Sequence, residues 1–122
     1  MSIHTGSIPP SVAAADAIWL STALKHMDPA PQPSMRKTIL VKDQSYETGF
    51  VQEPSAWHYG GKWHVIYGCG AGVGYASSSS PRNGPWTKHS ALVLGAGVGI
   101  AGAPVHQNIY REGNTLYMNH LS

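Results

Sequence analysis

The stretch EPSAWHYGGKWHVIY, residues 53–67, carries the clearest fold signal in the chain. Two runs rich in aromatic and β-branched residues flank the pair Gly60-Gly61. Two such runs joined by a glycine pair are typical of a β-hairpin, because glycine readily adopts the positive φ angles that tight hairpin turns need.

Two further strands are predicted after this hairpin. The segment VGYAS (residues 73–77) follows it directly, and WTKHSALVL (residues 86–94) follows a polar turn. Short strands separated by turn residues are typical of an antiparallel sheet. The sequence therefore predicts one four-stranded antiparallel sheet over residues 53–94, with residues 53–59 as its innermost strand.

The pattern then begins again. Ala-Pro at 103–104 echoes Glu-Pro at 53–54, an offset of 50 residues, and LYM at 116–118 echoes WHV at 63–65, an offset of 53. A period near 50 with four strands per unit is the signature of a β-propeller blade. The sequence predicts an all-β fold of antiparallel propeller blades, with one full blade and the start of the next within residues 36–122.

The first 35 residues have a different composition. Residues 11–26 are rich in alanine and begin with Ser11, which can cap a helix N-terminus. Three prolines between residues 28 and 34 exclude a helix there and predict an extended linker. Residues 1–35 are therefore predicted to form a short N-terminal helix and a proline-rich linker, with the boundary near Met35.

Composition excludes several classes of protein. Hydrophobic residues make up 42% of the 122, too many for a disordered chain. The net charge of +2 is too small to imply a nucleic-acid partner, and no segment has the apolar length that spans a bilayer. A single cysteine, Cys69, excludes an internal disulfide, and its apolar strand predicts a buried, unreactive thiol.

The ordered set of motifs resembles a known family. Residues 53–67, followed by VGYASSSSP (73–81), GPWT (84–87) and GAPVH (102–106), are similar to the first blades of the five-bladed glycosidases of glycoside hydrolase family 43 and the related families 32 and 68. The resemblance covers residues 36–122. It implies a partial five-bladed propeller that acts on carbohydrate.

The resemblance also implies a catalytic candidate. Activity in this family rests on three carboxylates from different blades, and Glu53 occupies the position of the general base. The family usually has aspartate there, and the longer glutamate would displace the carboxylate by about 1 Å. The other two carboxylates would belong to later blades, and no cofactor is implied.

Glycosidic hydrolysis normally needs two carboxyl groups about 5–9.5 Å apart. Of the acids in this chain, only Asp43 and Glu47 precede the inner strand closely enough to approach Glu53. We expect the chain alone to lack a complete catalytic set. The full set of acids is Asp16, Asp28, Asp43, Glu47, Glu53 and Glu112.

Two further residues are candidates for substrate contact. Trp57 either stacks on a sugar ring or packs in the core, and His106 lies on a predicted inner strand as a polar pocket contact. No metal site is expected, because the histidines lack ligand spacing. The aromatic residues predicted to belong to the blade core are Trp63, Tyr67 and Trp86.

Glu53 has two interpretations. As a functional group, it contacts sugar hydroxyls or an attacking water. As a structural group, it accepts backbone hydrogen bonds and fixes the loop at residues 45–49. In both cases Pro54 is expected to hold Glu53 in extended geometry.

Two functions remain open. The first is a glycoside hydrolase-like propeller module that binds carbohydrate or, in a complete ring, hydrolyses it. The second is a non-catalytic carbohydrate-binding protein, or a virion or surface structural protein, that oligomerises. Because one and a half blades leave strand edges unpaired, we expect self-association or a partner chain at those edges.

Overall fold

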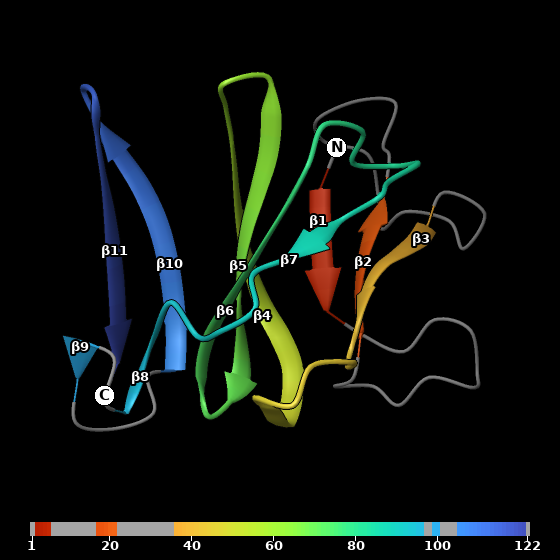
Figure 1. The fold of residues 1–122 in the computed structure, drawn as a ribbon. Helices are drawn as coiled ribbons and strands as arrows, with labels where there is room; N and C mark the ends of the chain where they lie inside the picture. The colour runs from red at the N-terminus through yellow and green to blue at the C-terminus, as the bar shows by residue number, and fades with distance from the viewer. Residues whose placement is uncertain (1, 6–16, 22–35, 97–98, 101–104, 122) are drawn as a thin grey trace.

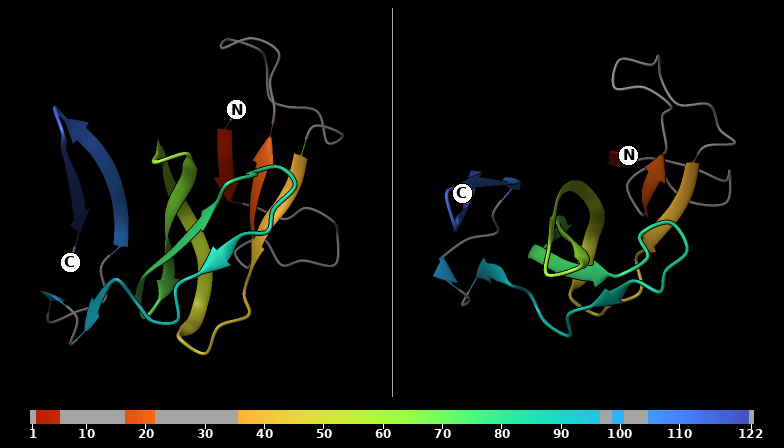
Figure 2. Two further views of the ribbon diagram at one scale, coloured as in Figure 1. Left: turned by 45° about the horizontal axis from the view of Figure 1, so that its top comes forward. Right: turned by 90° about the horizontal axis from the view of Figure 1, so that it is seen from above.

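The computed structural model describes residues 2–5, 17–21, 36–96, 99–100 and 105–121. The described elements are strands, arranged as three sheets that stand side by side (Figures 1 and 2). The central sheet lies between an N-terminal sheet and a C-terminal hairpin. No helix in the described part of the chain is long and apolar enough to cross a membrane.

The N-terminal sheet has three antiparallel strands in the order β1-β2-β3, with bounds Ser2–Thr5, Ala17–Ser21 and Arg36–Val41. The helix predicted over residues 11–26 is wrong at Ala17–Ser21, because these residues pair with strands on both sides. The remaining residues of that prediction lie outside the described part. Pairing and the burial of Ile18 (0% exposed) outweigh the helix preference of the nearby alanines.

The central sheet confirms the predicted hairpin. Its order is β4-β5-β6-β8-β9, and the short strand β7 pairs with β6 as well. The strands with their bounds are β4 (Glu47–Tyr59), β5 (Lys62–Gly70), β6 (Gly72–Ser78), β7 (Thr87–Lys88), β8 (Leu94–Ala96) and β9 (Gly99–Ile100).

The fourth predicted strand differs from the structure. Only Thr87–Lys88 and the segment from Leu94 onward pair with β6 as strands, both antiparallel. Between them, His89 N and Val93 N donate single hydrogen bonds to β6 carbonyls, 2.8 and 2.9 Å long. The ladder is interrupted, so one predicted strand becomes two short ones.

The C-terminal hairpin consists of β10 (Val105–Glu112) and β11 (Thr115–Leu121), which pair antiparallel around a turn at Gly113 and Asn114. The restart of the blade pattern predicted from the sequence is confirmed. The hairpin lies next to β4 and β5 of the central sheet.

The two hairpins repeat with a period of 53 residues. The pair Tyr59–Lys62 flanks the first turn and Glu112–Thr115 flanks the second. The register shifts after Gln52 in β4 and after Val105 in β10, again 53 residues apart. The structure therefore places a β-bulge at the same position of each hairpin.

The core lies between the N-terminal and central sheets. Along β5, Val65, Tyr67 and Cys69 are fully buried within this core, and a Cβ atom at the intervening Gly68 would contact Gln107 of the C-terminal hairpin. The Cys69 thiol donates to Gly72 O (3.3 Å), and burial raises its pKa, so it is a buried thiol with low nucleophilicity. The buried cluster comprises Ile18, Leu40, Val51, Val65, Tyr67, Cys69 and Ala76.

Candidate functional site

The two bulges bring Glu53 and His106 together. Glu53 Oε1 lies 2.8 Å from His106 Nδ1, and Glu53 Oε2 accepts a 2.9 Å hydrogen bond from the His106 backbone N–H. The Glu53 side chain is 26% exposed and the His106 side chain 67%. Two of the sequence candidates therefore form one polar pair, open to solvent, between strands of neighbouring sheets.

Both residues have an unusual backbone. Their φ angles are 55° for Glu53 and 54° for His106, in the left-handed region that favours glycine. Each such residue costs about 1–2 kcal/mol relative to ordinary geometry. The expectation that Pro54 holds Glu53 in extended geometry is therefore wrong, because the bulge turns the backbone at this residue.

Neighbouring contacts clamp the pair in place. The Gln107 side chain donates to Glu53 O (2.6 Å) and is 4% exposed. Ser55 Oγ donates to Asn108 Oδ1 (2.8 Å) and accepts from the Ile109 backbone N–H (3.0 Å). β4 and β10 belong to different sheets, and these side-chain hydrogen bonds connect them. They fix the spacing of the two strands around Glu53 and His106.

Glu47 makes backbone contacts in the loop before the inner strand, the role that the structural interpretation gave to Glu53. Glu47 Oε2 accepts hydrogen bonds from the backbone N–H groups of Asp43 and Gln44, both 2.7 Å long. Glu47 is 1% exposed and begins β4. The carboxylate that fixes the loop before the inner strand is therefore Glu47.

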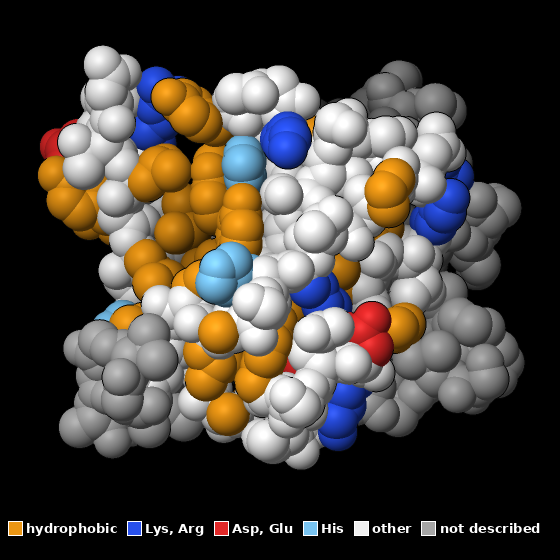
Figure 3. Space-filling view, viewed as in Figure 1, with side chains coloured by type: hydrophobic (Ala, Val, Ile, Leu, Met, Phe, Trp, Pro, Cys, Tyr) orange, Lys and Arg blue, Asp and Glu red, His pale blue; other side chains and the backbone are white. Residues whose placement is uncertain are grey.

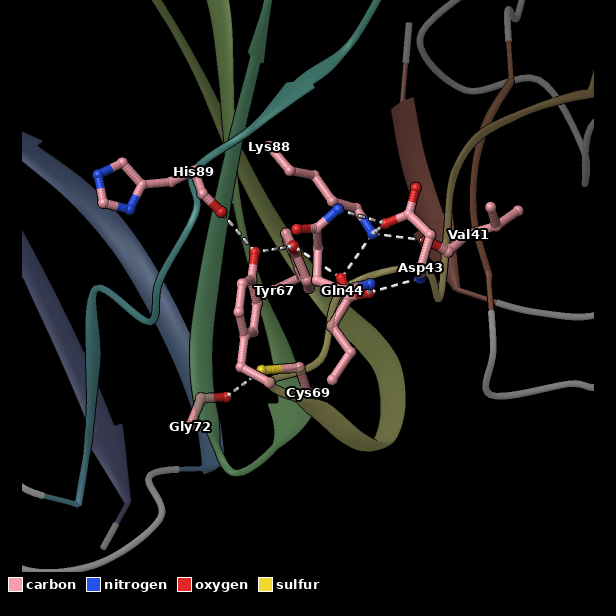
Figure 4. A network of polar contacts seen from close by, with 10 residues as sticks. Val41, Asp43, Gln44, Tyr67, Cys69, Gly72, Lys88 and His89 are labelled. Atoms are coloured by element: carbon pink, nitrogen blue, oxygen red, sulfur yellow. Dashed lines mark hydrogen bonds and ion pairs between the residues drawn. The ribbon is translucent and has the colours of Figure 1, made fainter.

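Glu47 belongs to an ionic network around Lys88, whose members Asp43 and Tyr67 are labelled in Figure 4. Lys88 Nζ donates to Glu47 Oε1 (2.5 Å), Asp43 Oδ1 (2.8 Å) and Val41 O (2.5 Å), which uses all three of its N–H groups. Tyr67 O–H donates to the same Glu47 oxygen (2.9 Å). The Lys88 and Glu47 side chains are 7% and 0% exposed, so this pair is buried, whereas Asp43 lies at the surface with 55% of its side chain exposed.

The network keeps both of its carboxyl groups ionised. Burial raises the pKa of Glu47, but the bonds from Lys88, the two backbone amides and Tyr67 together outweigh burial and lower it below its ordinary value. The hydrogen bond from Lys88 lowers the pKa of Asp43. A general acid needs a raised pKa, so neither Asp43 nor Glu47 is suited to donate a proton at neutral pH.

Trp57 lies farther along β4 and borders a cavity of about 350 Å³ between the tips of the two hairpins. Its ring stacks on His64, with centroids 5.2 Å apart and planes 16° apart. Hydrophobic side chains gather where the hairpin meets the central sheet (Figure 3). Trp57 is thus half-buried at a cavity wall, and it belongs to the side of the sheet opposite the core.

His64 holds that wall in place. Its Nε2 lies 3.0 Å from the carbonyl oxygen of Tyr59 and its Nδ1 lies 2.8 Å from the Tyr75 hydroxyl. A carbonyl only accepts, so Nε2 donates to the Tyr59 carbonyl oxygen. The histidines do not converge: the described residues include no group of three metal-ligating side chains.

Sequence reasoning did not identify Lys88 and Gln107. Lys88 is a single cation inside a predicted strand, where a charged side chain needs a partner. This signal would have indicated a buried acid such as Glu47. Gln107 gave no comparable signal. Its role arises from a contact with a residue 54 positions earlier.

Comparisons with known proteins agree with this architecture. No protein-family model and no curated protein matches the chain. The structure is similar to the crystal structure of a thermostable family-43 glycoside hydrolase, with a TM-score of 0.66 and 21% sequence identity. The match covers 85% of this chain and 37% of that protein.

The fold is therefore all-β, with antiparallel sheets like those of a β-propeller, as predicted from the sequence, whereas the N-terminal sheet β1-β2-β3 was not predicted. β4 is the edge strand of its sheet and lies beside both β1 and β10, as the innermost strand of a blade does. At this level of identity the similarity establishes the fold alone. The division of the chain at residue 35 stays a prediction.

Proposed function

We propose that this chain is a glycoside hydrolase-like β-propeller module that binds carbohydrate along β4 and β10, with Glu53, His106 and Trp57 as contacts. The Glu53–His106 pair supports this proposal best. Two residues at the same position of successive repeats share a strained backbone and face one another. Strain of this kind concentrates at binding and catalytic sites, where it aims a side chain.

The chemistry of the pair suits sugar hydroxyl groups. A carboxylate accepts hydrogen bonds from hydroxyls, and an imidazole both donates and accepts. Trp57 adds an aromatic surface on which the apolar face of a sugar ring can stack. Trp57 lines the cavity between the hairpin tips, farther along β4 than Glu53, so an extended saccharide would contact both places.

In a complete ring, the module would also hydrolyse the glycosidic bond of the carbohydrate that it binds. Glu53 would take a proton from a water molecule whose oxygen attacks the anomeric carbon, while a carboxylic acid protonates the departing glycosidic oxygen. Among the described acids, Asp43 and Glu47 are held ionised by Lys88, and Glu112 is exposed in the β10–β11 hairpin. The acid would therefore belong to another part of a complete ring.

A non-catalytic binding protein is the second candidate. Both oxygens of the Glu53 carboxylate contact His106, one to the ring and one to the backbone N–H. These contacts use two of the acceptor sites of the carboxylate for His106. The pair as it stands favours binding over turnover.

Replacing Glu53 by glutamine is expected to weaken saccharide binding at least tenfold and, in a complete ring, to abolish turnover. The amide keeps the length of the side chain, so the melting temperature should change by only a few degrees. Binding to a panel of oligosaccharides, measured by calorimetry on the 122-residue chain, checks this prediction.

Glu112→Gln is the matched control. It makes the same chemical change at an exposed carboxylate of β10 and should leave saccharide binding unchanged. Equal affinities of wild type and Glu53→Gln would rule out a functional role for Glu53. A large loss of stability in Glu53→Gln would assign the residue a structural role.

We also propose self-association through the C-terminal hairpin. Its exposed hydrophobic side chains include Tyr110 and Tyr117, stacked at 5.2 Å, together with Leu116 and Leu121. Within the described residues β11 pairs with β10 alone, so its other edge is open to a further strand. Sedimentation equilibrium should show dimers or larger species, and Tyr117→Lys should shift them to monomer. A wild-type monomer at every concentration tested would contradict the proposal.

A further inference from the structure

We propose that the cavity between the two hairpin tips takes an acidic saccharide, a sugar that carries a carboxylate, with Arg111 as its counter-charge. This inference rests on the proposed carbohydrate-binding function and names the class of sugar. The residues that line the cavity are Trp57, His58, Tyr59, Arg111, Asn114 and Leu116.

The cavity has the size and composition of a saccharide site. A volume of about 350 Å³ lies within the range of small-ligand pockets, about 300–1,000 Å³. Trp57 and Tyr59 provide aromatic surface from β4, and Asn114 provides an amide from the turn of the facing hairpin. Aromatic rings beside a few polar groups recognise the mixed apolar and hydroxyl surface of a sugar.

The Arg111 guanidinium is oriented by its own hairpin. Its Nε donates to Gly113 O (2.7 Å), and its Nη2 donates to Asn114 Oδ1 (3.3 Å). Both bonds use one edge of the planar group. The other edge, formed by Nη1 and Nη2, keeps the paired N–H groups that bind a carboxylate in bidentate fashion.

The positive charge of Arg111 is not neutralised within the described residues. Their ion pairs join Lys88 to Asp43 and Glu47, and His106 to Glu53, and none includes Arg111. Glu112 follows Arg111 in the chain but does not line the cavity. A cation that is fixed in direction beside an aromatic wall, without an acid of its own, favours an anionic ligand over a neutral one.

The test compares two probes that differ in charge, a trigalacturonate and the neutral trisaccharide of galactose with the same linkage. Calorimetric titration of the 122-residue chain should show about tenfold tighter binding of the trigalacturonate at low salt. The difference should shrink as ionic strength rises, because the Arg111 side chain is exposed.

Arg111→Gln should remove the preference, because it weakens binding of the trigalacturonate much more than binding of the neutral trisaccharide. Arg111→Lys should retain part of the preference, since it keeps the charge and loses the bidentate geometry. Lys37→Gln, which removes one exposed cation from β3, is the matched control and should behave as wild type.

The outcomes separate this inference from the proposed function. Equal affinity for the two trisaccharides in the wild type would overturn the acidic-sugar inference and leave carbohydrate binding in place. If Arg111→Gln weakened binding of both trisaccharides equally, with an unchanged melting temperature, the result would also overturn the acidic-sugar inference. Arg111 would then not distinguish a charged from a neutral sugar. Failure of both probes and of every neutral saccharide would overturn the proposed function as well.

Discussion

Replacing Glu47 by alanine is expected to lower the free energy of unfolding by about 3 kcal/mol, the lower end of the range for breaking a buried ion pair. In the wild type, the Lys88 side chain is 7% exposed and that of Asp43 is 55% exposed. The change leaves Lys88 with Asp43 as its one carboxylate partner. It also removes the acceptor of the Tyr67 hydroxyl. Urea unfolding followed by circular dichroism measures the difference.

Glu112→Gln is the control for this change, and its unfolding free energy should stay within about 0.5 kcal/mol of wild type. The double variant Glu47→Leu with Lys88→Met should recover part of the loss, because it removes both buried charges together. If Glu47→Ala lowered the free energy of unfolding by less than about 1 kcal/mol, the result would contradict a buried Glu47–Lys88 ion pair.

The network also predicts a loss of stability in acid. The pKa values of Glu47 and Asp43 are lowered in the folded chain, so the unfolded chain binds protons first as pH falls. The two carboxylates contribute fully to the free energy of unfolding above the ordinary carboxyl pKa of about 4. This contribution is lost as pH falls through their lower folded-state pKa values. The melting temperature of Glu47→Ala should therefore fall less steeply in acid than that of wild type.

Replacing Gly74 by alanine is expected to cost about 1–3 kcal/mol, the usual cost of inserting a methyl group into a packed core. A Cβ atom at Gly74 would lie 2.6 Å from Tyr67 Cε2 and 2.7 Å from its hydroxyl oxygen. Tyr67 is fully buried, and its hydroxyl donates to Glu47, so the ring cannot move without disturbing the network. Thermal and urea unfolding of the variant provide the measurement.

A double-mutant cycle tests the stated cause. In a Tyr67→Leu background, Gly74→Ala should cost much less than in wild type, because the shorter side chain leaves room for the added methyl group. Equal costs in both backgrounds would show that the ring of Tyr67 is not what requires glycine at this position.

Local signals in the sequence predicted the hairpins correctly. The turns at Gly60 and Gly113 have φ angles of 60° and 59°, and both lie between runs with strand composition. The alanine-rich segment predicted a helix because alanine has a high helix propensity. Pairing of Ala17–Ser21 with β1 and β3 makes these residues a strand instead, and such pairing is not visible in local sequence.

The candidate site was predicted in part. Glu53, His106 and Trp57 were identified singly, but the contact between Glu53 and His106 depends on bulges 53 residues apart. The Ala-Pro echo at residues 103–104, offset by 50, lies outside the described residues. Arg111 was not among the sequence candidates, because its place at the cavity follows from how two hairpins pack.

We propose that carbohydrate binds between β4 and β10, and two-dimensional NMR of the isotope-labelled chain, titrated with the saccharide that binds most tightly, tests this directly. We expect the shifted backbone and indole signals to cluster at Glu53, Trp57 and His106, with few changes around Glu47 and Lys88. Titration without shifts for any saccharide, or shifts confined to the N-terminal sheet, would contradict it.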